Sequence, residues 1–302
     1  MTWSAELLDQ LEFYWTVHFR PRLAGLTDDE YLWEPVDGAW SLRPAGPGDA
    51  LELEFVQPEP PIPPVTTIAW RAMHVGRDVL GKRARAFFGG SPAGESSDAD
   101  MYDARHWPSP LPSTADGALA LLDEAYGLWR SGVAALDDEA MLRPLGPRGG
   151  PYAQDSMAKL VLHVNREVLA HGAEICLLRD LYRAYADRRD PIVAAALRGD
   201  AAGVTAGGGA AGVRPTLVAE AAGLHHWEVV RALVTAGAPV DGALHYAAGA
   251  GRLEAVKLLV EHGADVSAQD DRFHLDAAGW ADFFQHPDVA AYLRSTAPSR
   301  SR

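Results

Sequence analysis

The stretch HVNREVLAHGAEI, residues 163–175, decides how the N-terminal half of the chain folds. His163, Glu167 and His171 recur in it at every fourth position, so in a helix their side chains project from nearly the same side. The same side carries an apolar stripe that should face a core, made of Leu160, Val164, Ile175 and Leu178. A carboxylate and an imidazole in such a stripe are costly to bury unless another group satisfies them. The stretch therefore predicts either a metal site or a hydrogen-bonded Glu–His pair within the core.

Bulk composition indicates the class of protein. With 302 residues, 48% of them hydrophobic and 23% charged, the chain has the composition of a soluble globular protein with room for two domains. A net charge of −14 argues against nucleic acid or an anionic membrane as a partner, because phosphate binding needs a basic surface.

The cellular location is predicted from what the sequence lacks. No apolar run has membrane-spanning length, the N-terminus has no secretion signal, and a single cysteine, Cys176, excludes an internal disulfide framework. We therefore expect a cytoplasmic protein. The preference for Arg over Lys, together with abundant Ala and Gly, indicates a bacterial source with a GC-rich genome.

Four amphipathic helices are predicted in the first half of the chain, at about residues 4–23, 67–88, 113–136 and 156–185. Ser113 and Asp116 form a capping arrangement for the third helix. LELEFV, residues 51–56, alternates apolar and acidic residues and predicts a short exposed strand. Four helices with apolar faces, joined by longish loops, predict a four-helix bundle.

A repeat begins after Asp190. Three similar segments, at residues 195–204, 221–230 and 247–256, follow one another in steps of 26 residues, and a degenerate copy occupies residues 274–295. Units of helix–turn–helix length cannot bury their apolar faces singly and must stack on one another. The second half is therefore predicted to be a stack of helix pairs.

The segment AAGAGRLEAVKLLVEHGADVSAQD, residues 247–270, with ALH before it, resembles an ankyrin repeat. The resemblance covers about Pro191 to Leu293 and implies three or four repeats in a domain at residues 191–296. Because the 26-residue steps fall short of the family's length of about 33, some hairpin loops must be trimmed. The resemblance also implies a protein partner for this domain, which the sequence does not identify.

Three segments of the first half resemble DinB/YfiT-like four-helix bundle proteins, a superfamily that includes the mycothiol-dependent maleylpyruvate isomerases. They are DGAWSLRP (residues 37–44), TTIAWRAMH (66–74) and HVNREVLAHGAEICLLRDLYR (163–183). The resemblance spans about residues 4–185. It implies an all-α chain, with a DinB-like four-helix bundle at residues 1–188 followed by the ankyrin-repeat helical stack.

Members of this superfamily commonly hold a divalent metal with a His from the second helix and two ligands from the fourth, which are Glu-x3-His in the mycothiol-dependent branch. The resemblance therefore implies His74, Glu167 and His171 as ligands of Zn²⁺ or Ni²⁺. It also implies a low-molecular-weight thiol such as mycothiol as a second cofactor. Two nitrogens and one oxygen leave an open position for water or a thiolate, which is the arrangement of catalytic metal sites.

Two further residues have alternative roles near this site. His163 is a rival ligand, but three ligands spread over two turns of one helix would splay too widely for one small ion. Its alternative roles are a hydrogen bond to one of the metal ligands or that of a hydrogen-bonded histidine at the boundary of the core. Asp78, one turn after His74, either orients that histidine or is solvated.

The remaining candidates have structural explanations beside functional ones. Four tryptophans either line a pocket beside the metal or belong to the core: Trp33, Trp40, Trp70 and Trp107. The repeat architecture explains the histidines of the second half, namely His225, His226, His245 and His262. Cys176 is explained as a small core residue.

Two hypotheses of function follow. The first is a metal-dependent thiol transferase or isomerase that acts on an electrophile. The alternative is a non-catalytic protein that senses a metal or ligand, or serves as a scaffold, and acts through ankyrin-mediated protein binding.

Overall fold

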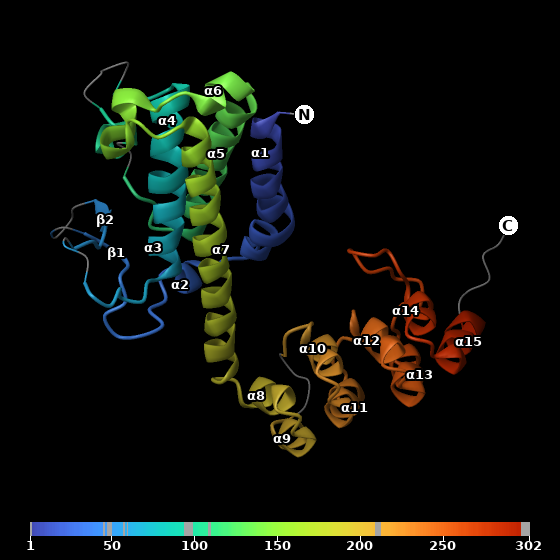
Figure 1. Ribbon diagram of the computed structural model, residues 1–302. Coiled ribbons are helices and arrows are strands. Elements are labelled where there is room, and N and C mark those ends of the chain that lie inside the picture. Colours follow the sequence, from blue (N-terminus) through green and yellow to red (C-terminus); the bar gives the residue numbers. More distant parts are fainter. Residues whose placement is uncertain are drawn as a thin grey trace. The chain divides into compact units, whose positions relative to one another are not determined.

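The computed structural model describes residues 2–44, 46, 50–56, 58, 60–93, 99–107, 110–208 and 213–296, traced in Figure 1 from blue to red. Its contacts divide the chain into two compact units, Met1–Arg183 and Ala184–Arg302. Both units are built of helices, which confirms the predicted all-α class. The regular strands of the described residues form one small antiparallel sheet, in which β1 (Leu42–Pro44) pairs with β2 (Leu51–Leu53). The predicted strand at residues 51–56 is therefore present in shortened form.

The first unit contains four long helical segments close to the predicted ranges. The first joins α1 (Trp3–Phe13), a π-helical segment (Tyr14–Phe19) and a 3-10 turn (Pro21–Leu23). The second joins α3 (Ile68–Met73), a π-helical segment (His74–Gly81) and α4 (Lys82–Phe88). The third is α5 (Ala115–Ala134) and the fourth is α7 (Met157–Asp187).

Local capping explains where these helices begin. The Thr67 hydroxyl accepts a hydrogen bond from the Trp70 amide and starts α3. At α5 the cap is Thr114, whose hydroxyl accepts from the Gly117 amide, so the predicted cap at Ser113 is wrong by one residue. Short elements that the periodicity did not predict connect the long ones: α2 (Asp28–Tyr31), α6 (Asp138–Leu142) and 3-10 turns at Ala104–His106 and Gly146–Tyr152.

The apolar stripe of α7 lies in the core of the bundle, as predicted. Its four members are all less than 9% exposed: Leu160, Val164, Ile175 and Leu178. Trp129 from α5 and Phe19 are fully buried in the same core. Burial of this stripe sets the rotation of α7 and therefore the direction in which its polar side chains point.

The second unit contains four pairs of short helices within the described residues. They are α8 (Pro191–Leu197), α9 (Ala201–Ala206), α10 (Leu217–Gly223), α11 (Trp227–Thr235), α12 (Ala243–Gly249), α13 (Leu253–Glu261), α14 (Ala277–Phe283) and α15 (Pro287–Thr296). The first helix of each pair contacts the first helix of the next pair, and the second helices form a parallel row (Figure 1). Buried Ala pairs such as Ala221 and Ala222 allow the close approach of neighbouring helices.

The spacing of the pairs confirms that some hairpins are trimmed. The first helices begin at Pro191, Leu217, Ala243 and Ala277, so the steps are 26, 26 and 34 residues. The connection between α13 and α14 is the long one, and it is closed by an antiparallel bridge between Gln269 and Asp276.

The turn inside each pair has a residue with positive φ at the equivalent position. These residues are Gly199 (81°), His225 (62°), Gly251 (65°) and Gln285 (64°). In two of the pairs the next residue is a histidine that reaches back to the preceding pair. His226 Nε2 donates to the Leu197 carbonyl at 3.3 Å, and His286 Nε2 donates to the Gly249 carbonyl at 3.1 Å. His245 Nε2 likewise donates to the Ala268 carbonyl. These contacts support the structural explanation of the repeat histidines.

We expect Gly251→Ala to destabilise the second unit by about 2 kcal/mol. About half comes from the left-handed backbone. The rest comes from displacement of His286, whose Nδ1 lies 2.6 Å from the position of an added Cβ, with loss of its hydrogen bond. Urea denaturation of the full chain, followed by circular dichroism, measures this change.

Gly237→Ala is the matched control, because Gly237 has φ of 88° and its added Cβ would meet no atom within 4 Å. Gly237→Ala should lower the free energy of unfolding by only about 1 kcal/mol. Equal losses in the two variants would contradict the stabilising role assigned to His286.

Candidate metal centre

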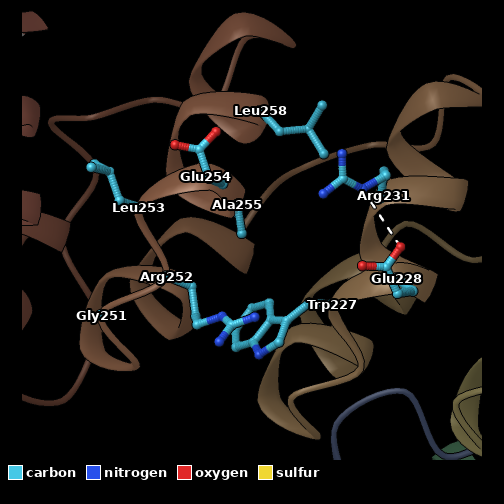
Figure 2. A pocket seen from close by; sticks show the side chains of 9 residues that line it. All are labelled: Trp227, Glu228, Arg231, Gly251, Arg252, Leu253, Glu254, Ala255 and Leu258. Carbon is cyan, nitrogen blue, oxygen red and sulfur yellow. Dashed lines mark ion pairs between the residues drawn. The ribbon is translucent and has the colours of Figure 1, made fainter.

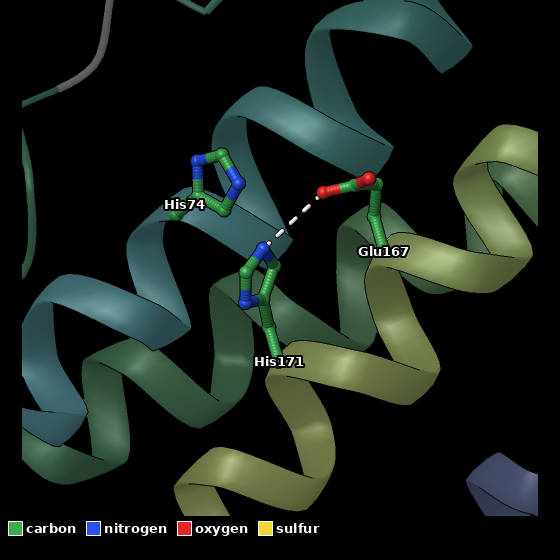
Figure 3. A group of neighbouring side chains, drawn as sticks. All are labelled: His74, Glu167 and His171. Atoms are coloured by element: carbon green, nitrogen blue, oxygen red, sulfur yellow. Dashed lines mark hydrogen bonds and ion pairs between the residues drawn. The ribbon is translucent and has the colours of Figure 1, made fainter. Parts of the chain in front are cut away.

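The structure brings the three predicted ligands together in the first unit. His74 begins the π-helical segment that follows α3, and Glu167 and His171 lie one turn apart on α7. Figure 3 shows the three side chains pointing toward one another. His171 Nε2 lies 3.2 Å from Glu167 Oε2, and the His74 and His171 rings are 4.9 Å apart in a T-shaped arrangement. One potential ligand atom from each residue lies within 4.8 Å of the other two.

Neighbouring aromatic residues hold the His74 ring. Trp70, one turn earlier, stacks on it with 5.2 Å between ring centroids, and Trp70 Nε1 donates to the Glu54 carbonyl at 2.8 Å. The ring centroids of Trp40 and Trp70 are 6.0 Å apart. Of the four tryptophans that the sequence raised, Trp70 contacts a predicted ligand, whereas Trp107 packs beneath the Arg85 guanidinium.

The electrostatic environment favours metal-binding forms of the donors. Burial, followed by the charge of His171, lowers the pKa of His74 to about 4, so this imidazole is neutral with a free lone pair at pH 7. Burial acts to raise the pKa of Glu167, but the three neighbouring histidines outweigh it and hold that pKa below its ordinary value. The donor set at neutral pH is therefore a neutral nitrogen from His74 and an ionised carboxylate beside His171.

The distances allow one small cation to be shared. Ligand atoms about 2.0–2.2 Å from a tetrahedral zinc are roughly 3.3 Å apart. The 3.2 Å between His171 Nε2 and Glu167 Oε2 already fits that spacing. No two of the ligand atoms are more than 4.8 Å apart, so the wider pairs would have to approach one another by side-chain rotation to share one ion. Two nitrogens and one oxygen leave room for a further ligand, so these residues fit a catalytic type of divalent-metal site.

His163 flanks Glu167 in the structure. His163 Nδ1 lies 3.5 Å from Glu167 Oε1, and it accepts a hydrogen bond from Arg166 at 2.7 Å. Arg83 approaches the other ring nitrogen at 3.4 Å. Oε1 is the Glu167 oxygen that faces away from His171. This geometry favours a role for His163 as a hydrogen-bonded neighbour of Glu167 over a role as a metal ligand.

Asp78 is engaged elsewhere. Its carboxylate accepts a hydrogen bond from Arg77 Nε at 2.9 Å and pairs with Lys82 at 2.8 Å. It therefore influences His74 through its charge and is not solvated freely. Cys176 packs against the core, and burial raises the pKa of its thiol, which supports its structural explanation.

Two neighbours of the site were missed from the sequence. Glu174 Oε2 lies 2.7 Å from His171 Nδ1, and Arg71 Nε lies 3.0 Å from the same carboxylate oxygen. Helical spacing in the sequence could have revealed them. Glu174 follows His171 by three positions and Arg71 precedes His74 by three, so each lies on the same helix face as a predicted ligand.

The fold and the site together define an all-α protein in which a helical bundle with a candidate divalent-metal centre is followed by a stack of helical repeats. Residues 51–175 match the model of the DinB superfamily, and residues 169–270 match that of ankyrin repeats (3 copies). The chain therefore carries a DinB superfamily domain followed by ankyrin repeats, which confirms the predicted resemblance. Members of the DinB superfamily bind metals. A comparison with curated proteins gave no match.

The DinB match contains all three predicted ligands, whereas the ankyrin match ends before the last helix pair. Residues 51–175 include His74, Glu167 and His171. The ankyrin match ends at residue 270, but the structure adds a fourth pair, α14 and α15, beyond it. Among the helices of the described residues, none combines the length and the apolar character needed to cross a membrane.

We expect the metal-free protein to lose stability as the pH falls from about 6.5 toward 4. The unfolded chain binds a proton on His74 near its ordinary pKa of 6.5, whereas the folded protein resists this until pH is about 4. Stability is therefore complete above pH 6.5 and declines by up to about 3 kcal/mol across this window.

Free energies of unfolding between pH 7.5 and 4.5, measured in a chelating buffer, check this expectation. His74→Gln cannot titrate at this position and should lose less stability over the same window. Parallel curves for the two proteins would contradict the depressed pKa of His74.

Proposed function

We propose that the first unit binds a divalent cation, Zn²⁺ or Ni²⁺, through His74, Glu167 and His171, and works with a low-molecular-weight thiol such as mycothiol as a transferase or isomerase. The observation that carries the proposal is the convergence of two imidazoles and one carboxylate from two helices within 4.8 Å. The DinB superfamily match supports the metal, because its members bind metals. A cytoplasmic location, where thiols stay reduced, suits such chemistry.

The side chains of the site have different roles. The Trp70 stack holds the neutral ring of His74 in place, and the charge of Glu167 attracts a cation. When bound, the cation would favour the thiolate form of a thiol in the open position. The half-buried position of the three residues keeps them accessible to a small molecule.

The Glu167→Ala/His171→Ala double variant tests this proposal. We expect purified wild-type protein to contain about one equivalent of metal by elemental analysis and to consume an electrophile only when a thiol is supplied. The double variant should lose both properties, because one remaining histidine cannot hold the ion.

The control is His262→Ala, which removes an exposed histidine of the second unit and should leave metal content unchanged. Wild-type thiol-dependent turnover in the double variant would refute the enzymatic proposal. Metal binding without turnover would favour the sensing role instead.

We propose as the second candidate a protein that senses a ligand or serves as a scaffold through its ankyrin repeats. Ankyrin repeats imply protein–protein interaction. A pocket of about 920 Å³ lies along the first helices of the repeats and the long α13–α14 connection. Aromatic and charged side chains line it, among them Tyr246, Asp270, Arg272, Phe273, Trp280 and Phe284. Tyr246 and Phe284 are about half exposed, at 52% and 50%, which is typical of a contact surface.

The second helices of the repeats line a smaller pocket, which is a poorer candidate for binding a protein partner. A pocket of about 270 Å³ lies between α11 and α13, and Figure 2 shows the side chains that line it. The Arg252 guanidinium lies over the Trp227 ring, 5.6 Å from its centroid. Arg231 pairs with Glu228 at 3.7 Å, so two of its charges already have partners. The larger aromatic pocket is therefore the better candidate for a protein partner.

We expect Tyr246→Ala/Phe284→Ala to weaken capture of a partner by the full chain more than tenfold, because aromatic anchors that a partner buries contribute about 2 kcal/mol or more each. Quantitative mass spectrometry of proteins captured from a lysate of the source organism measures this. Arg231→Ala/Glu228→Ala, on the opposite row, is the control and should capture normally. Equal capture by both variants would refute the assignment of this surface.

A further inference from the structure

The two ring nitrogens of His171 face different carboxylates. Nε2 faces Glu167 Oε2 at 3.2 Å, on the side of His74, and Nδ1 faces Glu174 Oε2 at 2.7 Å. An imidazole that binds a metal through Nε2 must carry its proton on Nδ1. A carboxylate only accepts hydrogen bonds, so Glu167 and Glu174 compete for the proton of His171. The contact of Nδ1 with Glu174 is the shorter one, at 2.7 Å against 3.2 Å, and it therefore favours the tautomer in which the Nε2 lone pair is free for a cation.

Arg71 holds Glu174 in this position. Arg71 Nε donates to Glu174 Oε2 at 3.0 Å from α3, and the Arg71 guanidinium lies over the Trp70 ring at 5.2 Å. Trp70 is the residue that also stacks on His74. The same tryptophan therefore supports one ligand directly and the other through Arg71 and Glu174.

Arg71 also sits close to His171, with 3.2 Å between Arg71 Nη1 and His171 Nδ1. A guanidinium only donates, so this contact would need Nδ1 without its proton, in competition with Glu174. The contact with Glu174 is shorter, at 2.7 Å against 3.2 Å, which makes it the stronger of the two. The proton therefore belongs on Nδ1.

We propose that Glu174, held by Arg71, is a positioning residue of the metal centre that fixes the tautomer and orientation of His171. The inference rests on the metal binding proposed above. It assigns Glu174 a hydrogen bond to a ligand and not a bond to the cation, because its carboxylate faces the ring nitrogen opposite the one that faces Glu167.

A matched control exists on the same helix. Asp180 of α7 pairs with Arg22 at 2.6 Å, and its side chain is 51% exposed, close to the 46% of Glu174. Both are arginine-paired carboxylates on α7, and exposed pairs of this kind contribute little stability on their own. Of these two, Glu174 contacts His171.

The experiment measures the Zn²⁺ affinity of the full chain by competition with a chromophoric chelator. We expect Glu174→Ala to bind Zn²⁺ 10- to 100-fold more weakly than wild type, which is about the loss seen for such partners elsewhere. Glu174→Gln keeps an acceptor oxygen and should lose less. Arg71→Gln should weaken binding, and the Arg71→Gln/Glu174→Ala double variant should bind no more weakly than Glu174→Ala alone. Asp180→Asn should match wild type within twofold.

Each other outcome overturns the inference. Wild-type affinity in Glu174→Ala would remove the positioning role, and a loss as large as that of His171→Ala would make Glu174 a direct ligand. A wild-type protein that binds no Zn²⁺ or Ni²⁺ would refute the proposed function as well. Nitrogen-15 NMR of the metal-free protein gives a second readout, in which the His171 proton should lie on Nδ1 in wild type and shift toward Nε2 in Glu174→Ala.

Discussion

Burial of the apolar face of α7 is the constraint on which the candidate metal centre depends. Val164, Val168 and Ile175 are fully buried, so the helix cannot rotate without exposing them. Glu167 and His171 then lie at the edge of this buried face, with side chains 23% and 17% exposed. That position shields them enough to strengthen their electrostatic interactions but leaves them within reach of a cation from solvent. The site is therefore a consequence of how the core is packed.

The contact between Glu167 and His171 alone is also explained by a hydrogen-bonded Glu–His pair, which the sequence left as the alternative to a metal. His74 is the residue that favours the metal proposed above over the pair. Its ring comes from another helix, is neutral because burial depresses its pKa, and has a lone pair available near the same point. A Glu–His pair gains little from such a neighbour, whereas a cation gains a third ligand. The wide turns of the π-helical segment that begins at His74 are common at functional positions.

Helical periodicity was enough to predict the long helices, the buried stripe of α7 and the shared side of Glu167 and His171. Periodicity could not predict that His74 converges on them, because His74 lies 93 positions before Glu167. That expectation came from the family resemblance. Helical spacing places Arg71 and Glu174 on the faces of predicted ligands, but it does not reveal their contact, which joins different helices. The cap at Thr114 was missed by one residue because Ser113 and Thr114 both have hydroxyl groups that can cap, and only the backbone geometry distinguishes them.

The repeat spacing explains where exposed aromatic side chains gather on the second unit. Steps of 26 residues leave only a short connection between α11 and α12, whereas the 34-residue step allows a long connection between α13 and α14. A long connection has room for side chains that no helix contact buries, and Phe273 within it is 56% exposed. It packs against Trp280, which in turn stacks on Phe284. The aromatic pocket therefore lies at this end of the stack because the trimmed hairpin before α12 is too short to build one.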